Sequence, residues 1–318
     1  MPNPVSPFLQ NQGFLILDGG LATELEARGK NISDPLWSAK VLVEDPDFLR
    51  TVHYDYLVSG ADCIVSASYQ ATVEGFVRRG LSEWEATSAM RLSVKLAVEA
   101  RDLFWEKQEN RKGRLRPLVA SSVGPYGAYL ADGSEYDGRY GLSRADLVAF
   151  HRDRWFLLAD CGADLLACET IPSLSETHAL LDLLRETPDK HALFSFSCRD
   201  AETLHDGNRL ADALTPLSRS EQVVAVGANC VPPSLVAGLI RTISGATSKP
   251  VMVYPNSGES WNAESKTWYG TADPVDFAAA SSEWYRSGAT VIGGCCRTGP
   301  EHVRAMRSTL EEESAKTD

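Results

Sequence analysis

Three cysteines at the ends of two apolar segments have the residue type and spacing of a metal site. Cys295 and Cys296 are adjacent and follow Gly293-Gly294, and Cys230 closes an earlier apolar segment. Thiolates are good zinc ligands, and a site with three protein ligands keeps the fourth tetrahedral position open for chemistry. We therefore predict that Cys230, Cys295 and Cys296 hold one Zn²⁺ per chain.

The adjacency of the cysteine pair restricts its backbone. Neighbouring side chains on a strand point to opposite faces, so both thiols reach one metal only where the chain leaves extended geometry. The two preceding glycines permit that departure. Two alternatives remain open for the pair. It could be buried core thiols, the interpretation that we prefer for Cys63, Cys161 and Cys198, or a redox disulfide, which leaves Cys230 unexplained.

Two acidic residues also follow apolar segments. Asp18 precedes Gly19-Gly20, and Glu169 lies in the sequence Cys168-Glu169-Thr170. A carboxylate at the end of a buried strand needs a partner. For Glu169 we favour a ligand ammonium group over an internal arginine. Asp18 fits a site residue and a turn or cap residue beside its glycines equally well.

The segment 124–140 combines tyrosines with carboxylates. Aromatic faces and acidic side chains together suit a cationic ligand. We select Tyr129 and Glu135 as candidate contacts for such a cation. The alternative is a packed surface loop stiffened by its tyrosines.

The elements that must position these residues alternate regularly. Eight short apolar runs without strict polar alternation are typical of strands buried on both faces of a parallel sheet, and they occupy residues 14–20, 62–68, 117–125, 164–170, 192–198, 223–230, 250–256 and 290–296. Amphipathic helical patterns lie between them. The sequence thus predicts an α/β fold, a (β/α)8 TIM-type barrel in a single domain over residues 1–318. The alternative, an open doubly wound sheet, lacks support because no G-x-G-x-x-G follows a strand.

A barrel places the candidate residues together. Active sites of such barrels lie at the carboxyl ends of the strands, where all the acidic and thiol candidates fall. Cys230 ends the sixth predicted strand and the cysteine pair ends the eighth. Alternate strands contribute side chains to the same layer, so the three thiols are expected to meet.

Composition excludes several classes of function. The net charge of −12 and the pI of about 5.0 argue against nucleic-acid binding, which needs a basic surface. The first residues have no charged segment followed by an apolar one, and no apolar run is long enough to span a membrane. We expect a cytoplasmic protein with reduced cysteines.

Several segments together resemble one known family, the homocysteine S-methyltransferases, and in particular the type that uses S-methylmethionine. The resemblance covers about residues 11–311 and is carried by DGGLATELEARG (18–29), SASYQAT (66–72), SVGPYGAYLADGSEY (122–136), LLACET (165–170), GANC (227–230), YPNSGE (254–259) and GGCCR (293–297). It implies methyl transfer from a sulfonium, S-methylmethionine or S-adenosylmethionine, to the thiol of L-homocysteine, which yields methionine.

The resemblance also implies residue roles. Cys230, Cys295 and Cys296 correspond to the family's zinc ligands, and Glu169 to the residue that holds the homocysteine amino group. Other residues implied for the amino-acid site are Asp18, Gly19, Ser66 and Gln70. The partners are small molecules, with neither nucleic acid nor membrane, and the oligomeric state is undetermined.

Two rival functions use the same thiols. A zinc hydrolase or deaminase would activate water at the open position and would need a general base, yet neither H-x-E nor P-C-x-x-C occurs. A zinc sensor or structural zinc protein would need a fourth fixed ligand, which the sequence does not supply.

Overall fold

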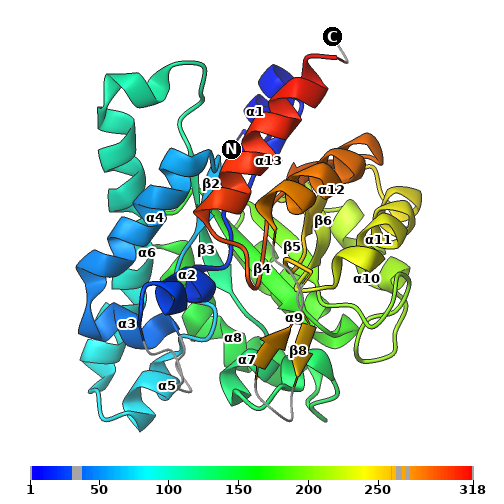
Figure 1. The fold of residues 1–318 in the computed structure, drawn as a ribbon. Coiled ribbons are helices and arrows are strands. Elements are labelled where there is room, and N and C mark those ends of the chain that lie inside the picture. The colour runs from blue at the N-terminus through cyan, green and yellow to red at the C-terminus, as the bar shows by residue number, and fades with distance from the viewer. Residues whose placement is uncertain (1, 31–37, 259, 263–266, 270–272, 317–318) are drawn as a thin grey trace.

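The computed structural model describes residues 2–30, 38–258, 260–262, 267–269 and 273–316 (Figure 1). Its centre is one eight-stranded sheet whose neighbouring strands are all parallel. The strands, in chain order, are β1 (Leu15–Ile16), β2 (Cys63–Val65), β3 (Leu118–Val123), β4 (Leu165–Ile171), β5 (Ala192–Phe196), β6 (Val223–Asn229), β7 (Val251–Tyr254) and β10 (Ala289–Ile292).

The sheet closes on itself. Its order is β1-β10-β7-β6-β5-β4-β3-β2, and a parallel bridge between Leu17 and Cys63 joins the two outer strands. The amide of Asp18 donates to the carbonyl of Cys63 at 3.0 Å, beside that bridge. The predicted (β/α)8 barrel is therefore confirmed.

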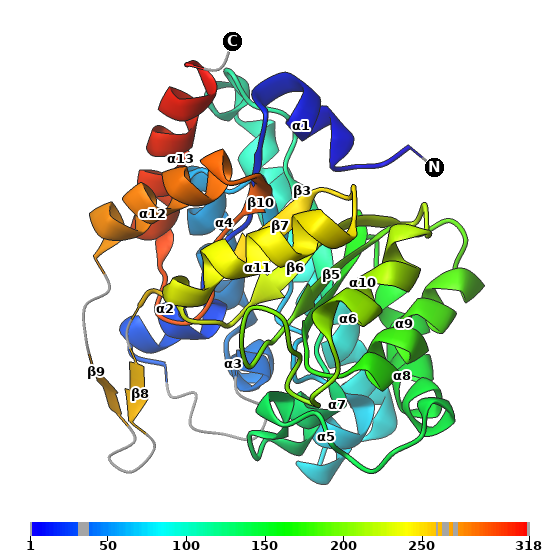
Figure 2. The same cartoon turned by 90° about the vertical axis from the view of Figure 1, so that its right-hand side faces the viewer.

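Helices surround the strands, as Figures 1 and 2 show from two directions. They are α1 (Ser6–Gln12), α2 (Leu21–Ala27), α3 (Ser38–Glu44), α4 (Pro46–Ser59), α5 (Val73–Arg78), α6 (Glu83–Glu106), α7 (Tyr126–Leu130), α8 (Arg144–Ala159), α9 (Leu174–Glu186), α10 (Leu210–Ser218), α11 (Pro233–Ala246), α12 (Pro274–Arg286) and α13 (Pro300–Ser314), with short 3-10 helices η1 (Gln108–Arg111) and η2 (Ser134–Tyr136). None of the helices in the described ranges has the length and apolar character that crossing a membrane requires.

The strands are apolar on both faces because they separate two cores. Phe14 and Ile16 belong to the larger core between the sheet and the surrounding helices. Leu15 and Leu17 belong to a second core inside the barrel, which α1 covers with Phe8. This double burial explains why the strand sequences lack polar alternation.

The segments that follow β3 and β7 contain regular structure of their own. The segment after β3 forms α7 and η2, and the segment after β7 includes an antiparallel pair, β8 (Ser260–Asn262) and β9 (Thr267–Tyr269). Both lie at the carboxyl ends of the strands, which is the end that carries the candidate residues.

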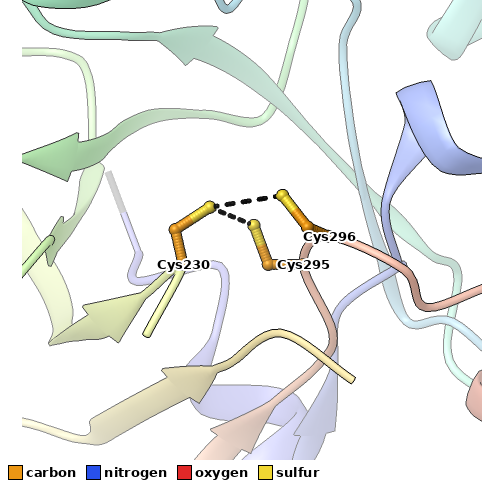
Figure 3. A group of neighbouring side chains, drawn as sticks. All are labelled: Cys230, Cys295 and Cys296. Carbon is orange, nitrogen blue, oxygen red and sulfur yellow. Dashed lines mark hydrogen bonds between the residues drawn. The ribbon is translucent and has the colours of Figure 1, made fainter. Parts of the chain in front are cut away.

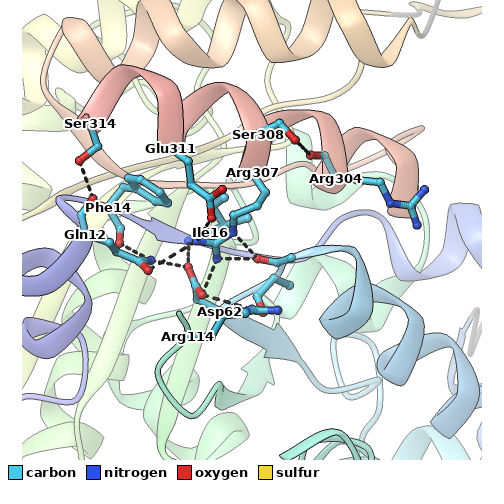
Figure 4. A network of polar contacts seen from close by, with 12 residues as sticks. Gln12, Phe14, Ile16, Asp62, Arg114, Arg304, Arg307, Ser308, Glu311 and Ser314 are labelled. Atoms are coloured by element: carbon cyan, nitrogen blue, oxygen red, sulfur yellow. Dashed lines mark hydrogen bonds and ion pairs between the residues drawn. The ribbon is translucent and has the colours of Figure 1, made fainter. Parts of the chain in front are cut away.

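The opposite end of the barrel is held by a buried ion-pair network around Asp62, shown in Figure 4. The Asp62 carboxylate lies 2.5 Å from Arg307 Nη2 and 3.3 Å from Arg114 Nη2. It also accepts hydrogen bonds from Gln12 Nε2 at 2.7 Å and from the amide of Ile16 at 3.1 Å. The network thus joins α13 and the segment beside α1 to the start of β2.

Candidate metal centre

The three predicted thiols meet at the carboxyl end of the barrel (Figure 3). Cys230 directly follows β6, and the cysteine pair follows β10 after two glycines. Cys230 Sγ lies 2.6 Å from Cys295 Sγ and 3.8 Å from Cys296 Sγ, and all three sulfurs are within 4.8 Å of one another. Strand β7 alone separates β6 from β10, which is the spacing that the barrel prediction required.

The pair reaches one point because the chain turns there. The carbonyl of Cys295 accepts the amide of Thr298 at 3.3 Å, and Arg297 has a left-handed backbone with φ of 66°. Neither of the two glycines has a positive φ, but both pack closely against other segments. A Cβ on Gly294 would lie 2.2 Å from Thr298 Oγ1, and one on Gly293 2.6 Å from Leu17 Cβ. They are needed for close packing.

The thiols have the chemistry of a soft-cation site. Zn–S bonds of about 2.3 Å place sulfurs about 3.8 Å apart in a tetrahedron. The Cys230–Cys296 distance matches this value, whereas the 2.6 Å between Cys230 and Cys295 is shorter, so these two thiols would separate to bind one ion. Hydrogen bonds from Cys230 and Cys295 lower the pKa of Cys296. The same contacts and burial raise the pKa values of Cys230 and Cys295, so the cluster favours one thiolate beside two thiols. Three half-buried sulfur ligands around one point fit zinc, which would deprotonate them on binding.

A single cavity joins the thiols to the predicted acidic residues. Its wall includes Asp18, Gly19, Ser66, Glu135, Glu169, Cys230, Cys295 and Cys296. No lysine or arginine is among the described residues that line it. An uncompensated acidic wall beside a metal site favours ligands with a positive charge.

Glu169 has hydroxyl partners and no ion pair among the described residues. It accepts a short hydrogen bond from Ser122 Oγ and one from Tyr254 Oη at 3.3 Å. Burial raises the pKa of Glu169 to about 7. The predicted alternative, an internal arginine paired with Glu169, is absent from the described contacts.

Asp18 is 5% exposed and accepts one hydrogen bond, from the amide of Val65 at 2.9 Å. Burial and the nearby Glu169 carboxylate raise the pKa of Asp18 well above its usual value. Two buried carboxyl groups that lack a cation thus lie near one another in the cavity. An ammonium group is the ligand that would satisfy both.

The loop after β3 contributes Glu135 and Tyr136 to the cavity. The Glu135 backbone is held by Ser197 Oγ, which donates to its carbonyl at 3.0 Å, while its Oε2 is buried without a hydrogen-bond partner. Burial and the Cys230 charge raise the pKa of Glu135. The Tyr136 hydroxyl is hydrogen-bonded to Cys230. This loop therefore places one carboxyl group and one aromatic ring beside the thiols.

Two predicted residues lie outside the cavity wall. The ring of Tyr129 packs against Tyr126 and Phe150, at centroid distances of 5.8 and 5.1 Å, and Arg78 covers its face. Gln70 is not a lining residue either, and its Oε1 is buried without a hydrogen-bond partner. These two side chains therefore do not line the cavity, and their contact with a ligand stays a prediction.

Asn229 is a site residue that the sequence did not single out. Its Oδ1 accepts the amide of Thr170 and the hydroxyl of Ser195, each at 2.8 Å, and its Nδ2 donates to Thr170 Oγ1 at 2.8 Å. Thr170 and Cys230 have φ of 60° and 52°, a conformation that costs about 1–3 kcal/mol each in residues other than glycine. Asn229 thus holds the strained Thr170, which follows Glu169, and directly precedes the strained Cys230. In the sequence, only its position next to Cys230 indicated that Asn229 could belong to the site.

Comparisons with known proteins agree with this geometry. A homocysteine S-methyltransferase family model matches residues 15–310. The chain is 49% identical to homocysteine S-methyltransferase YbgG of Bacillus subtilis (strain 168), over 96% of both chains. It is 48% identical to homocysteine S-methyltransferase of Escherichia coli (strain K12), over 96% of this chain and 98% of that one.

Solved structures of a homocysteine methyltransferase have the same fold as this chain. The metallated form of the homocysteine methyltransferase MmuM from Escherichia coli superposes with a TM-score of 0.86 at 47% identity, covering 96% of this chain and 99% of that chain. Its oxidized form gives 0.87 at 45% identity, with the same coverage. The chain belongs to the homocysteine S-methyltransferase family and is a methyltransferase built on a (β/α)8 barrel.

Proposed function

We propose that this enzyme transfers a methyl group from S-methylmethionine to the thiol of L-homocysteine, using one zinc ion held by Cys230, Cys295 and Cys296. The observation that carries the proposal is the cluster of three thiols in a cavity with an acidic wall. Both substrates are amino acids with an ammonium group, and the donor is also a sulfonium. The acidic wall suits two ammonium groups and one sulfonium beside a thiol-binding metal.

The metal would supply thiol activation. A free thiol has a pKa of about 8.5, and coordination to zinc removes its proton at neutral pH. The chain's residues contribute orientation, which is worth as much as about 7–11 kcal/mol when two reactants are held in line. No described cavity residue is required as a general base during the transfer.

For homocysteine, we assign the ammonium group to Asp18 and Glu169. Asp18 is buried and Glu169 is half-buried, and neither makes a described ion pair, although the charge of Arg154 lowers the Glu169 pKa from a distance. A bound ammonium group would favour the ionised form of Glu169, whose pKa is about 7. Gly19 and Ser66 line the same part of the cavity. Gln70, outside the wall, acts on this site only through the backbone of its segment.

For the donor, we assign the ammonium group to Glu135 and the sulfonium to the ring of Tyr136. A cation over an aromatic ring gains about 0.5–2 kcal/mol, which is weak enough not to trap the ground state. In the transfer, the homocysteine sulfur forms a bond to the methyl carbon while the carbon–sulfur bond of the donor breaks. The electron pair stays on the leaving sulfur, so both products are neutral thioethers, here two molecules of methionine.

Metal analysis and donor trials test this assignment. The purified enzyme is expected to contain one zinc per chain and to form methionine from homocysteine with S-methylmethionine, and S-adenosylmethionine is assayed in parallel. Glu169→Gln should raise the KM for homocysteine by about 10–100-fold, the value of one charged hydrogen bond, while zinc content is unchanged. An unaltered homocysteine KM in this variant would contradict the role of Glu169.

The donor assignment has a matched control in the same loop. Glu135→Gln should raise the KM for S-methylmethionine, whereas Tyr129→Phe, outside the cavity, should leave it unchanged. A larger effect of Tyr129→Phe would restore the sequence-based choice of Tyr129. Hydrolysis of donor without homocysteine would instead favour the rival zinc hydrolase, in which water takes the open position.

A further inference from the structure

A buried arginine on α8 connects two loops that line the cavity without lying in the cavity itself. Arg154 is 4% exposed. Its Nη1 donates to the carbonyl of Gly124 at 3.0 Å, and its Nη2 donates to the carbonyls of Ser68 and Tyr69 at 2.8 and 2.6 Å. Gly124 follows β3 and the other two follow β2. One guanidinium therefore joins the carboxyl ends of two neighbouring strands.

The two loops are in close backbone contact, so a displacement of one loop also displaces the other. A Cβ on Gly124 would lie 2.4 Å from the carbonyl oxygen of Tyr69. Tyr69 lines the cavity, and its hydroxyl is hydrogen-bonded to Thr170, which follows Glu169. The Arg154 contacts thus fix the backbone that carries one wall of the cavity.

The same helix supports the next part of the loop after β3. His151 Nε2 lies 2.8 Å from Glu176 Oε1, and both side chains are fully buried. The same Glu176 oxygen accepts the amide of Tyr126 at 2.6 Å. Phe150 packs edge-to-face on the Tyr126 ring at 4.8 Å. The loop that carries Glu135 and Tyr136 therefore begins on a support built from α8 and α9.

We propose that Arg154 is a positioning residue for the methyl donor. Glu176 is a second positioning residue, because it holds the start of the loop after β3. The assignment rests on the proposed function, in which Glu135 and Tyr136 hold the donor. Homocysteine, in contrast, is assigned to Asp18 and Glu169, which are held by β1 and β4. Of the residues assigned to homocysteine, only Ser66 lies on one of the loops that Arg154 joins, whereas both assigned donor contacts follow β3. Displacement of the loops after β2 and β3 should therefore weaken the donor site more than the homocysteine site.

Arg154→Lys tests the contribution of the guanidinium geometry. Lysine keeps the positive charge, which favours ionised Glu169, but its single ammonium cannot reproduce the planar fork that reaches three carbonyls. A displacement near 1 Å can cost as much as about 100-fold in rate. We expect the KM for S-methylmethionine to rise about 10–100-fold, with a smaller rise in the homocysteine KM and zinc content unchanged.

The matched control is Arg101→Lys. Arg101 is also 4% exposed, but it pairs with Asp164, at 2.7 Å, at the opposite end of the barrel. This variant should lose stability without separating the two KM values. If Arg154→Lys raises both KM values equally, or lowers stability alone, the proposal is wrong.

Two further measurements keep the proposal testable. Glu176→Gln should also raise the KM for S-methylmethionine, by a smaller factor. This variant provides the test if Arg154→Lys does not fold. Amide hydrogen exchange should accelerate at residues 66–72 and 124–141 in either variant, and not around Cys230. This exchange result tests the loop support even if wild-type enzyme fails to use S-methylmethionine, which would instead refute the proposed function. Unchanged exchange in both loops would overturn the support itself.

Discussion

The two ends of the barrel each bury an aspartate, and their surroundings differ completely. Asp62, 1% exposed, has two arginines, a glutamine and a backbone amide as partners. Asp18, 5% exposed on the neighbouring strand, accepts one backbone amide and has a raised pKa. A buried carboxylate without a cationic partner is costly. The Asp18 end of the barrel therefore lacks a counter-ion that a bound ligand could provide.

Backbone conformation follows the same division. Connections at the Asp62 end use Gly60, Gly162 and Gly288, whose positive φ values of 118°, 83° and 110° carry no side-chain penalty. At the other end, Thr170 and Cys230 adopt positive φ despite their side chains. Backbone strain and carboxyl groups without ion pairs thus occur together at the end where we place the ligands, whereas the Asp62 carboxylate at the opposite end is paired.

The largest expected effect is on the thiol end. Cys295→Ser should lose zinc and reduce kcat/KM by more than about 100-fold, because even residues that only support metal ligands cost 10–100-fold when changed. The far end should remain folded. Metal analysis, kinetics and urea unfolding on the same preparation check this, and full zinc content in the variant would reject Cys295 as a ligand.

The opposite end should respond in stability. Asp62→Ala leaves Arg114 and Arg307 without their shared counter-ion, so we expect a loss of about 3–5 kcal/mol in the free energy of unfolding. Zinc content and both KM values of the remaining folded enzyme should not change. A KM change without a stability loss would mean that the two ends are coupled.

Asp18→Asn is the reciprocal test. Asparagine keeps an acceptor for the Val65 amide and removes a charge that burial disfavours, so the unfolding free energy should change by less than about 1 kcal/mol. The KM for homocysteine should rise about 10–100-fold, the value of a charged hydrogen bond. Strong destabilisation instead would show that Asp18 is a structural residue like Asp62.

His53 on α4 tests burial without a hydrogen-bond partner or a ligand. Both ring nitrogens lack hydrogen-bond partners, and burial lowers the pKa of His53 to about 4. The neutral ring favours folding above pH 6.5, and this contribution is lost as the pH falls toward 4, by about 3 kcal/mol in total. His53→Leu should flatten the decline of unfolding free energy between these pH values, and identical pH profiles would contradict this.

Much of the site follows from local sequence. The apolar runs predict the strands because burial on both faces leaves a continuous hydrophobic pattern. The barrel then places every strand end on one rim, which brings Cys230 to the cysteine pair and Glu169 to the same cavity. These residues could be predicted because each directly ends, or closely follows, a regular strand.

Residues in irregular loops could not be assigned in this way. The sequence indicated Tyr129, but the helix α7 turns its ring toward Phe150, and Tyr136 lines the cavity instead. Asn229 and Arg154 act through backbone groups of distant segments, and such contacts have no local sequence pattern.

The sequence by itself determined the barrel, the three thiols and the acidic character of the site, because these depend on residue type and on strand periodicity. Only the tertiary structure decided which tyrosine of the loop reaches the thiols, which aspartate is paired and which is left for a ligand. The physical reason is that these outcomes depend on packing between helices and loops far apart in the chain. Asp18 and Asp62 are the same residue type at neighbouring strands, and their neighbours alone make one structural and the other available for binding.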